Sequence, residues 1–310
     1  MKTIFEKVEK EIYDYSNLMC GALILDGKAV SEKILSETKE KIDIMCHNNA
    51  VPRPSLAIVI VGNNPASETY VKAKIRACEN AGISSKLIRF DESIGNFELF
   101  NEVSKLNSSH FDGFIVQLPL PEHINVDAII GHIDPDKDVD GFHPLNFGRM
   151  AIGQPSMRPA TPYGILKLLQ HYEIETKGKH VVVIGRSNLV GKPISIMLGN
   201  DFGIGRSTVT SCDINTPKEL LIEQTKMADI VIVAVGKPGL LTADMVKPGV
   251  VVIDVGINRN EEGKLIGDVD FEKVSEIAGW ITPVPGGVGP MTVSALMLNT
   301  FDSWRRRCFE

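Results

Sequence analysis

The feature that most constrains the fold of this chain is a stretch of strand, glycine-turn and helix character at residues 179–193. Residues 181–184 form a β-branched run of three valines and an isoleucine, which is typical of a buried strand. Gly185 follows at once, and Gly191-Lys192-Pro193 opens a helical pattern whose first turn tolerates proline. Because this geometry directs backbone N–H groups and a helix N-terminus toward a phosphate, the stretch indicates a dinucleotide-binding turn.

The spacing of this turn differs from two common phosphate-binding loops. Ser187 stands where the dinucleotide fingerprint Gly-x-Gly-x-x-Gly has its second glycine. Five residues separate Gly185 from Gly191, and Pro193 follows Lys192, so no hydroxyl is placed for magnesium as it is in a Walker loop. A variant Rossmann turn and an ordinary tight turn are the two interpretations that this stretch alone leaves open.

Composition bounds the class of protein. A length of 310 residues predicts about two domains, and the net charge of −6 gives no basic surface for nucleic acid. The longest apolar runs are too short to span a membrane. The five cysteines are odd in number and lack metal-ligand or redox spacing, which favours reduced thiols in a cytoplasmic protein without a metal site.

Residues 1–20 are predicted to be a separate N-terminal extension. Their acidic residues argue against a transit peptide, and no apolar signal-peptide core precedes Cys20. Ile4, Phe5, Val8 and Ile12 recur at helical spacing. We therefore expect an amphipathic helix that serves packing or dimer formation.

Residues 27–140 alternate between helix and strand patterns, which predicts a parallel sheet with crossover helices. On the helix predicted to begin near Ser67, Tyr70 and Lys74 are four residues apart and share one face. A functional pair is one interpretation of this spacing. A solvated lysine beside a half-buried tyrosine is the other.

Two further polar positions stand out in the first half of the chain. Gln117 ends an apolar strand, and ligands of open parallel sheets lie beyond the carboxyl ends of strands. The acidic run at residues 134–142 lacks the glutamate that closes a calcium loop, so calcium is rejected. Asp140 of this run is predicted to point into a cleft and bind a nitrogen-rich ring. The alternatives are a backbone cap for Gln117 and a solvated turn for the acidic run.

In the second half, Asp213 ends the strand predicted at residues 208–212. An acidic residue there commonly binds the ribose hydroxyl of NAD, whereas a nearby arginine accommodates the phosphate of NADP. Arg186 is that arginine, so Asp213 either contacts the cofactor or pairs with Arg186. Gly236 follows a later strand and would let the backbone approach a flat cofactor.

The periodic pattern also predicts where the elements begin and end. Thr161 is predicted to cap a helix, and the proline- and glycine-rich run 282–292 is predicted to be irregular. The final helix is expected to return to the first domain. The predicted strands are 55–61, 86–90, 113–117, 181–184, 208–212, 230–235 and 250–255, and the main predicted helices are 27–48, 67–78, 97–106, 163–172, 217–228 and 293–306.

Five stretches together resemble the bifunctional methylenetetrahydrofolate dehydrogenase/methenyltetrahydrofolate cyclohydrolase family. They occur in the family's order, and the last is the most specific. The stretches are Tyr70-Val71-Lys72-Ala73-Lys74, Val116-Gln117-Leu118-Pro119-Leu120-Pro121, Asp138-Val139-Asp140-Gly141, Gly185-Arg186-Ser187 with Val190-Gly191-Lys192-Pro193, and Pro283-Val284-Pro285-Gly286-Gly287-Val288-Gly289-Pro290-Met291-Thr292.

The resemblance implies a two-domain α/β fold with the folate in the cleft between the domains. Residues 21–160, completed by a C-terminal helix at 293–310, would bind folate, and residues 161–292 would form a Rossmann-like NAD(P)-binding domain. The implied protein is a cytoplasmic homodimer of one-carbon metabolism that serves purine biosynthesis. It would oxidise 5,10-methylenetetrahydrofolate with NADP⁺ and hydrolyse the methenyl product to 10-formyltetrahydrofolate.

The resemblance also implies residue roles. Lys74 matches the family's catalytic lysine and Gln117 its partner, while Tyr70 would stack on the folate and Asp140 would anchor its pterin ring. The implied substrate-binding set also contains Pro285 and Gly286, and the cofactor-binding set is Gly185, Arg186, Ser187, Asp213, Ile214, Gly236, Ile257 and Thr292.

One departure from the family bears on the cofactor. The family usually has a His-Ser pair where this chain has Asp213-Ile214, and that serine helps to hold the 2′-phosphate. NAD therefore remains a possible cofactor in addition to NADP. A dehydrogenase without hydrolase activity, a non-catalytic Rossmann-type binding protein and a dehydrogenase of amino acid or shikimate-like substrates are the alternative functions.

Overall fold

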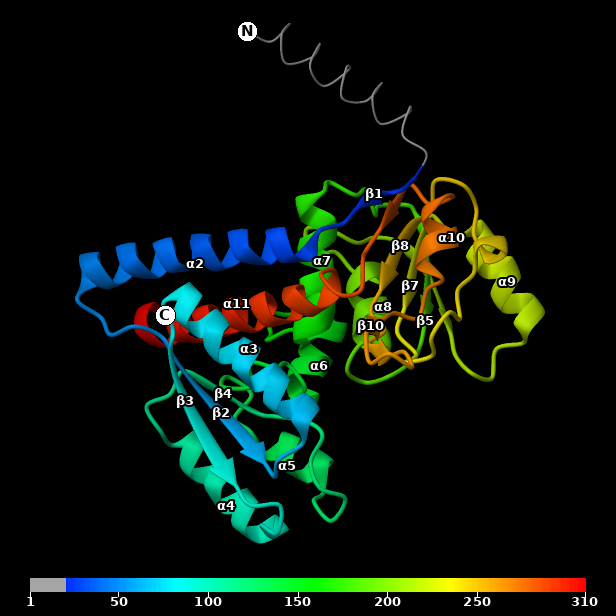
Figure 1. Ribbon diagram of the computed structural model, residues 1–310. Coiled ribbons are helices and arrows are strands. Elements are labelled where there is room, and N and C mark those ends of the chain that lie inside the picture. Colours follow the sequence, from blue (N-terminus) through cyan, green and yellow to red (C-terminus); the bar gives the residue numbers. More distant parts are fainter. Residues whose placement is uncertain (1–20) are drawn as a thin grey trace, which may run out of the picture.

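The computed structural model describes residues 21–310, and the helix predicted for residues 1–20 lies outside that range. The described chain forms two parallel sheets flanked by helices, with the long helix α11 (Val288–Phe309) beside the smaller sheet (Figure 1). The predicted two-domain α/β fold with parallel sheets is confirmed.

The smaller sheet has three parallel strands, β2 (Ser55–Val61), β3 (Ser84–Phe90) and β4 (Gly113–Val116), in the order β3-β2-β4. Alternate residues of β2 are buried on opposite faces, as expected for a strand covered on both sides. The helices of this half of the molecule are α2 (Gly27–Asn49), α3 (Pro65–Ala81), α4 (Asn96–Asn107), α5 (Val126–His132) and α6 (Pro144–Ala151). Helices α4 and α5 share a buried cluster with one face of β2, and α3 shares another with the opposite face.

The larger sheet has six parallel strands in the order β1-β11-β8-β7-β5-β6. Its central strands are apolar and buried, which places the predicted Rossmann run in the middle of a core. The strands are β1 (Leu23–Ile24), β5 (His180–Ile184), β6 (Thr208–Cys212), β7 (Ile230–Val233), β8 (Val251–Asp254) and β11 (Trp280–Ile281). The helices of this half are α7 (Ala160–His171), α8 (Gly191–Gly199), α9 (Lys218–Met227), α10 (Phe271–Ser275) and the 3₁₀ turn η1 (Ala243–Met245).

Four very short strands are absent from the sequence prediction. Strands β1 and β11 extend the larger sheet, and β9 (Asn258–Arg259) and β10 (Leu265–Ile266) form a separate antiparallel ribbon. Each has two residues, which is too short for an alternating apolar pattern to appear.

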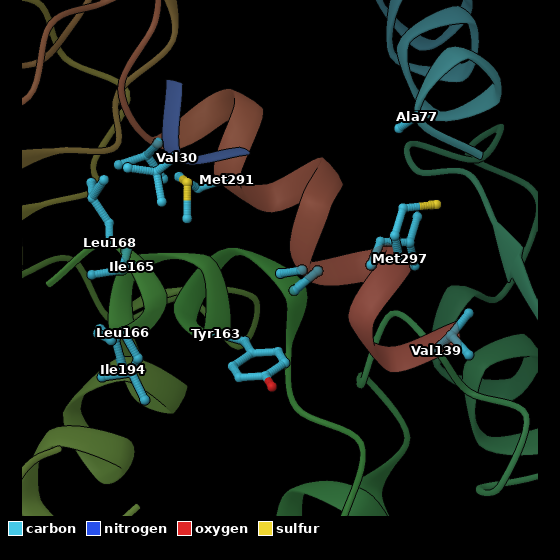
Figure 2. Packing of buried hydrophobic residues seen from close by; sticks show 14 of the residues in the cluster. Val30, Ala77, Val139, Tyr163, Ile165, Leu166, Leu168, Ile194, Met291 and Met297 are labelled. Atoms are coloured by element: carbon cyan, nitrogen blue, oxygen red, sulfur yellow. The ribbon is translucent and has the colours of Figure 1, made fainter. Parts of the chain in front are cut away.

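Helix α11 joins the buried cores of the two halves. Figure 2 shows α11 crossing the cluster that contains Val30 of α2, Leu168 of α7 and Met291 of α11 itself. Farther along α11, Asn299 Nδ2 donates to the carbonyl of Val139 at 2.8 Å, and Trp304 Nε1 donates to a carbonyl before β2. The C-terminal half of α11 is therefore fixed to the smaller-sheet half of the molecule.

The predicted irregular run 282–292 was wrong in its second part. Helix α11 begins at Val288, so Gly289, Pro290 and the following residues are helical. Pro290 lies in the first turn, where a backbone N–H has no partner within the helix and its loss costs little.

The predicted capping role of Thr161 was also wrong. Helix α7 begins at Ala160, and its N-cap residue is Pro159. The hydroxyl of Thr161 instead lies 3.0 Å from the hydroxyl of Thr292 on α11.

Helix α3 begins earlier than predicted. Asn64 caps it through Oδ1, which accepts from Ala66 N at 2.9 Å and Ser67 N at 3.3 Å, and Pro65 takes the first helical position. An Asn-Pro pair can start a helix as well as a turn.

Candidate active site

Lys74, Gln117 and Asp140 form a compact buried group that we call the lysine cluster. Lys74 lies on the buried face of α3 and is 7% exposed. Its Nζ donates to Gln117 Oε1 at 3.1 Å and lies 4.0 Å from Asp140 Oδ1. Residues that are 43 and 66 positions beyond Lys74 in the sequence thus converge on one ammonium group.

The orientation of Gln117 follows from its place at the end of β4. Its backbone N–H still bonds to the carbonyl of Val59 in the neighbouring strand, at 2.8 Å. Its side-chain Nε2 donates to the carbonyl of Leu118 at 2.7 Å, which leaves Oε1 to accept from Lys74. The side chain is therefore fixed from both of its polar atoms.

Within the acidic run, the structure separates the aspartates by role. Asp138 is 2% exposed and accepts from the backbone of Phe142 and His143 and from Asn146 Nδ2. Burial raises the pKa of Asp138, and these hydrogen bonds oppose the shift. Asp138 thereby holds the turn that presents Asp140 to Lys74.

A cleft of about 640 Å³, the central cleft, lies between α3 and the segments that follow β8 and β11. Tyr70, Ile257, Pro285 and Gly286 line it, so predicted substrate residues and a predicted cofactor residue share one cleft. Tyr70 is 37% exposed, and burial of the rest of its ring raises the pKa of its hydroxyl. Lys74 follows Tyr70 by one helical turn, but Lys74, Gln117 and Asp140 are not themselves among the residues that line this cleft.

The glycine turn after β5 is tightly closed. Gly185 has a φ of 118°, and a Cβ on Gly191 would lie 1.9 Å from the carbonyl oxygen of Gly185. Ser187 Oγ accepts from Val190 N at 3.1 Å and from Gly191 N at 3.4 Å. Both glycines are required by this geometry, and Ser187 stabilises the turn from within.

Arg186 and Asp213 meet beside a second hollow, the arginine hollow, of about 500 Å³. Arg186 Nη1 lies 3.2 Å from Asp213 Oδ2, and Nη2 donates to the carbonyl of Ser211 at 2.6 Å. Both predictions for Asp213 are compatible with this place, because it pairs with Arg186 and also lines the hollow. Ile214 is 98% exposed, and the structure does not bring it to the wall of the hollow.

The last two predicted cofactor residues lie at the ends of other elements. Gly236 follows β7 with a φ of 66°. Thr292 lies in the second turn of α11, where its hydroxyl is 3.0 Å from that of Thr161 and donates to the carbonyl of Val288 at 3.2 Å.

The sequence reading missed three polar residues of this region. Ser67 lies on the same buried face of α3 as Lys74 and is 3% exposed, and its hydroxyl has no hydrogen-bond partner among residues 21–310. Its position seven residues before Lys74 was the signal that could have identified it. Asp254 and Asp268 are buried beside the central cleft, and nothing in their local sequence distinguishes them.

Across residues 21–310, no three His, Cys, Asp or Glu side chains gather as metal ligands would. The four cysteines of that range are free thiols. None of its helices combines the length and hydrophobicity needed to cross a bilayer.

Comparison with known families matches both halves of the chain. Residues 25–140 match the family described as tetrahydrofolate dehydrogenase/cyclohydrolase, catalytic domain. Residues 159–308 match tetrahydrofolate dehydrogenase/cyclohydrolase, NAD(P)-binding domain.

Individual relatives agree with the family match. The chain is 56% identical to "Bifunctional protein FolD 1" of Geobacter metallireducens over 91% of this chain and 97% of that protein. Among solved structures, the FolD enzyme of Campylobacter jejuni is 48% identical, with a TM-score of 0.88 over 92% of this chain and 99% of that one. The FolD protein of Trypanosoma brucei, solved with NADP and an inhibitor, is 34% identical, with the same TM-score over 94% of this chain and all of that one.

Proposed function

The chain belongs to the tetrahydrofolate dehydrogenase/cyclohydrolase family, and we propose that the lysine cluster is the hydrolytic centre of its active site. The enzyme oxidises 5,10-methylenetetrahydrofolate to the 5,10-methenyl form with NAD(P)⁺ and hydrolyses that product to 10-formyltetrahydrofolate. The observation that carries the proposal is the convergence of Lys74, Gln117 and Asp140 one helical turn from Tyr70, which lines the central cleft together with Ile257.

The turn after β5 fits a dinucleotide. A Cβ on Gly185 would lie 2.3 Å from the carbonyl oxygen of Ala234. Only glycine therefore fits where the loops after β5 and β7 meet, and no side chain at this position covers the backbone. Helix α8 begins directly after the turn, and its N-terminus favours the negative charge of a pyrophosphate. When bound, NAD(P)⁺ accepts the hydride from the one-carbon bridge.

Each residue of the lysine cluster has a proposed role in hydrolysis. Water attack on the methenyl carbon forms a C–O bond and releases one proton. Cleavage of the bond between that carbon and N5 then forms the formyl carbonyl, and the remaining hydroxyl proton is transferred to N5. Lys74 transfers the released proton as a general acid–base group, and Gln117 orients Lys74 through the 3.1 Å hydrogen bond between them. Ser67, whose buried hydroxyl is free to donate and accept, supplies a further hydrogen bond to water on the same face of α3.

The same cleft is proposed to hold and orient the folate for both steps. Asp140 accepts hydrogen bonds from the nitrogen-rich pterin ring, and Tyr70 stacks on the substrate with its exposed face. Pro285 and Gly286 complete the wall opposite α3. Ile257 lies on the same wall, and with Gly236 and Thr292 it is proposed to contact the dinucleotide on the adjoining side.

We propose NADP⁺ as the preferred cofactor. Arg186 is 48% exposed in its side chain at the rim of the arginine hollow and can pair with a 2′-phosphate there. The 3.2 Å ion pair with Arg186 offsets the negative charge of Asp213. Asp213 therefore repels the 2′-phosphate only if Arg186 moves away from Asp213. NAD⁺ is the second candidate, since Asp213 in the same hollow can accept from ribose hydroxyls.

A spectrophotometric assay with methylenetetrahydrofolate, run in parallel with NADP⁺ and NAD⁺, tests this proposal. Turnover mainly with NADP⁺ supports the role of Arg186. Turnover mainly with NAD⁺ would mean that Asp213 accepts hydrogen bonds from the ribose hydroxyls in the arginine hollow. Loss of hydrolysis in Lys74→Met, assayed with preformed methenyltetrahydrofolate, is the companion result expected for the lysine cluster.

The remaining expectations concern the whole protein. We propose a homodimer in the cytoplasm that supplies one-carbon units for purine biosynthesis. We also propose that residues 21–160 with the C-terminal helix form the folate-binding domain, and that residues 161–292 form the dinucleotide-binding domain. Size-exclusion chromatography with light scattering tests the dimer directly.

A further inference from the structure

Two aspartates beside the central cleft are buried and have no part in the proposed chemistry. Asp254 is 3% exposed at the end of β8, and Asp268 is fully buried in the segment after β10. A buried carboxylate is costly unless its oxygens are fully hydrogen-bonded. We call these two residues the carboxylate pair.

Asp268 links two loops that come from different strands. Its Oδ2 accepts from Val235 N at 2.8 Å and Gly236 N at 2.9 Å, both in the loop after β7. Its Oδ1 accepts from Asn258 Nδ2 at 2.9 Å, just beyond the loop after β8. One carboxylate therefore fixes the distance between two cofactor-facing segments.

Asp254 in turn fixes Asp268. Its Oδ1 accepts from Gly256 N and Asp268 N, both at 2.9 Å, and its Oδ2 accepts from Val269 N at 3.0 Å. Glycines make room for both carboxylates. A Cβ on Gly256 would lie 2.3 Å from Asp268 Cγ, and a Cβ on Gly267 would lie 1.8 Å from Asp254 Oδ2.

The loops held in this way carry residues on the cofactor side of the cleft. Residues 254–259 line the central cleft, and Ile257 within them is 48% exposed. Gly236 is itself one of the donors to Asp268. Small displacements of such segments weaken ligand binding, because binding geometry depends on the groups that support the contacting residues.

We propose that Asp268, held by Asp254, is a positioning residue for the dinucleotide, which sets Gly236 and Ile257 at the spacing that NAD(P)⁺ requires. This inference rests on the proposed assignment of Gly236 and Ile257 to the cofactor. It predicts that Asp268 influences cofactor affinity and the dehydrogenase step, while the lysine cluster and hydrolysis are unaffected.

The test is a series at position 268 with a matched control. Asp268→Asn leaves one amide oxygen to accept from the three donors Val235 N, Gly236 N and Asn258 Nδ2. Asp268→Ala leaves no side-chain acceptor for them. Asp112 supplies the control, since it is 2% exposed and accepts from Ser55 N, Ser55 Oγ and Arg307 Nε in the folate half. For every variant, the KM for NADP⁺, the cyclohydrolase rate on preformed methenyltetrahydrofolate and the Tm are measured on the full chain.

The expected result is a graded rise in the KM for NADP⁺. Asp268→Asn should raise it about threefold, as for one lost hydrogen bond, and Asp268→Ala about tenfold, as for several. Cyclohydrolase kcat/KM stays within about twofold of wild type in Asp268→Asn, because hydrolysis needs no dinucleotide and the residues proposed to contact folate lie on other segments. Asp112→Asn lowers the Tm and leaves the KM for NADP⁺ unchanged.

An unchanged KM for NADP⁺ in a folded Asp268→Asn protein overturns the inference, as does an equal loss of both activities. Ile257→Ala separates this failure from that of the cofactor assignment. If Ile257→Ala raises the KM and Asp268→Asn does not, only the positioning role fails. If neither variant changes the KM, the proposed cofactor wall is wrong and the positioning role fails with it.

Discussion

The two oppositely charged pairs of the site differ most in their exposure to solvent. The side chains of Lys74 and Asp140 lie 4.0 Å apart and are 9% and 14% exposed. Those of Arg186 and Asp213 lie 3.2 Å apart and are 48% and 25% exposed. Water screens the second pair much more than the first. Under the proposed function, the folate side fixes its chemistry through one rigid arrangement of charges, whereas the dinucleotide side can change its cofactor preference through a single surface residue.

The largest expected effect is at Lys74. Lys74→Met keeps the length of the side chain and removes its proton chemistry, so cyclohydrolase activity should fall by about 10³-fold, within the range for general acid–base catalysis. The rate is measured with preformed methenyltetrahydrofolate.

Lys72→Met is the matched control, because Lys72 is an exposed lysine of the same helix. It should retain the wild-type rate. Full activity in Lys74→Met would show that the buried pair is structural and would remove the contrast between the two regions.

The next effect is at Asp140. Asp140→Ala removes a charged acceptor from the pterin, and the KM for folate should rise by about 10- to 100-fold, as for a lost hydrogen bond to a charged group. The rise should be similar for both activities, because one folate site serves both. Asp136→Ala, whose side chain is 79% exposed in the same turn, should have no effect. A rise confined to one activity would mean two separate folate sites.

The buried charge of Asp254 should appear as a pH dependence of stability. Burial raises its pKa from 3.8 to about 6, and the neighbouring charge of Asp268 adds to the shift. Between these values the folded protein binds more protons than the unfolded chain, so this group lowers the stability as pH rises from about 4 to about 6. The cost should be about 3 kcal/mol above pH 6, since each pKa unit corresponds to about 1.4 kcal/mol.

Thermal melts of wild type and Asp254→Asn from pH 4 to pH 7 measure this cost. The variant loses hydrogen bonds at every pH, so its Tm relative to wild type is informative only through its change with pH. That relative Tm should rise across this range. A constant difference would mean that Asp254 is ionised throughout and that its hydrogen bonds offset its burial.

The smallest effect is expected at the exposed pair. Asp213→Ser removes a negative charge beside the proposed 2′-phosphate site, and the ratio of kcat/KM for NADP⁺ over NAD⁺ should rise by about threefold to fivefold. Asp201→Ser is the control, because Asp201 also pairs with an exposed arginine, Arg206, away from the arginine hollow. A fall in the ratio would mean that Asp213 supports NADP⁺ binding through its hold on Arg186.

The sequence predicts those parts of the site that follow from local rules. The spacing of Tyr70 and Lys74 places them on one helical face, and the apolar run before Gln117 places it at a strand end. The acidic run alone leaves a cleft-facing Asp140 and a solvated turn as alternatives, and the family resemblance favours Asp140. The structure gives the physical difference, since Asp138 is occupied by backbone donors while Asp140 faces Lys74.

Other parts depend on contacts that no local pattern encodes. Two of the three donors to the Asp268 carboxylate are backbone groups 32 and 33 residues earlier, and backbone donors leave no residue type to recognise. The hydroxyl of Thr161 bonds across 131 residues to Thr292, which local capping rules do not anticipate. Strands β1 and β11 have two residues each and pair Leu23 and Ile24 with Trp280 and Ile281, which are far apart in the sequence.

The most direct test of the separation between the two regions is a time course of Lys74→Met with methylenetetrahydrofolate and NADP⁺. Reduced dinucleotide and methenyltetrahydrofolate are followed together by their absorbance. The account predicts that reduced dinucleotide still forms and that methenyltetrahydrofolate accumulates in equal amount, because Lys74 serves hydrolysis alone. Loss of both signals would contradict it by showing that hydride transfer also needs Lys74, and continued conversion to 10-formyltetrahydrofolate would contradict the hydrolytic role.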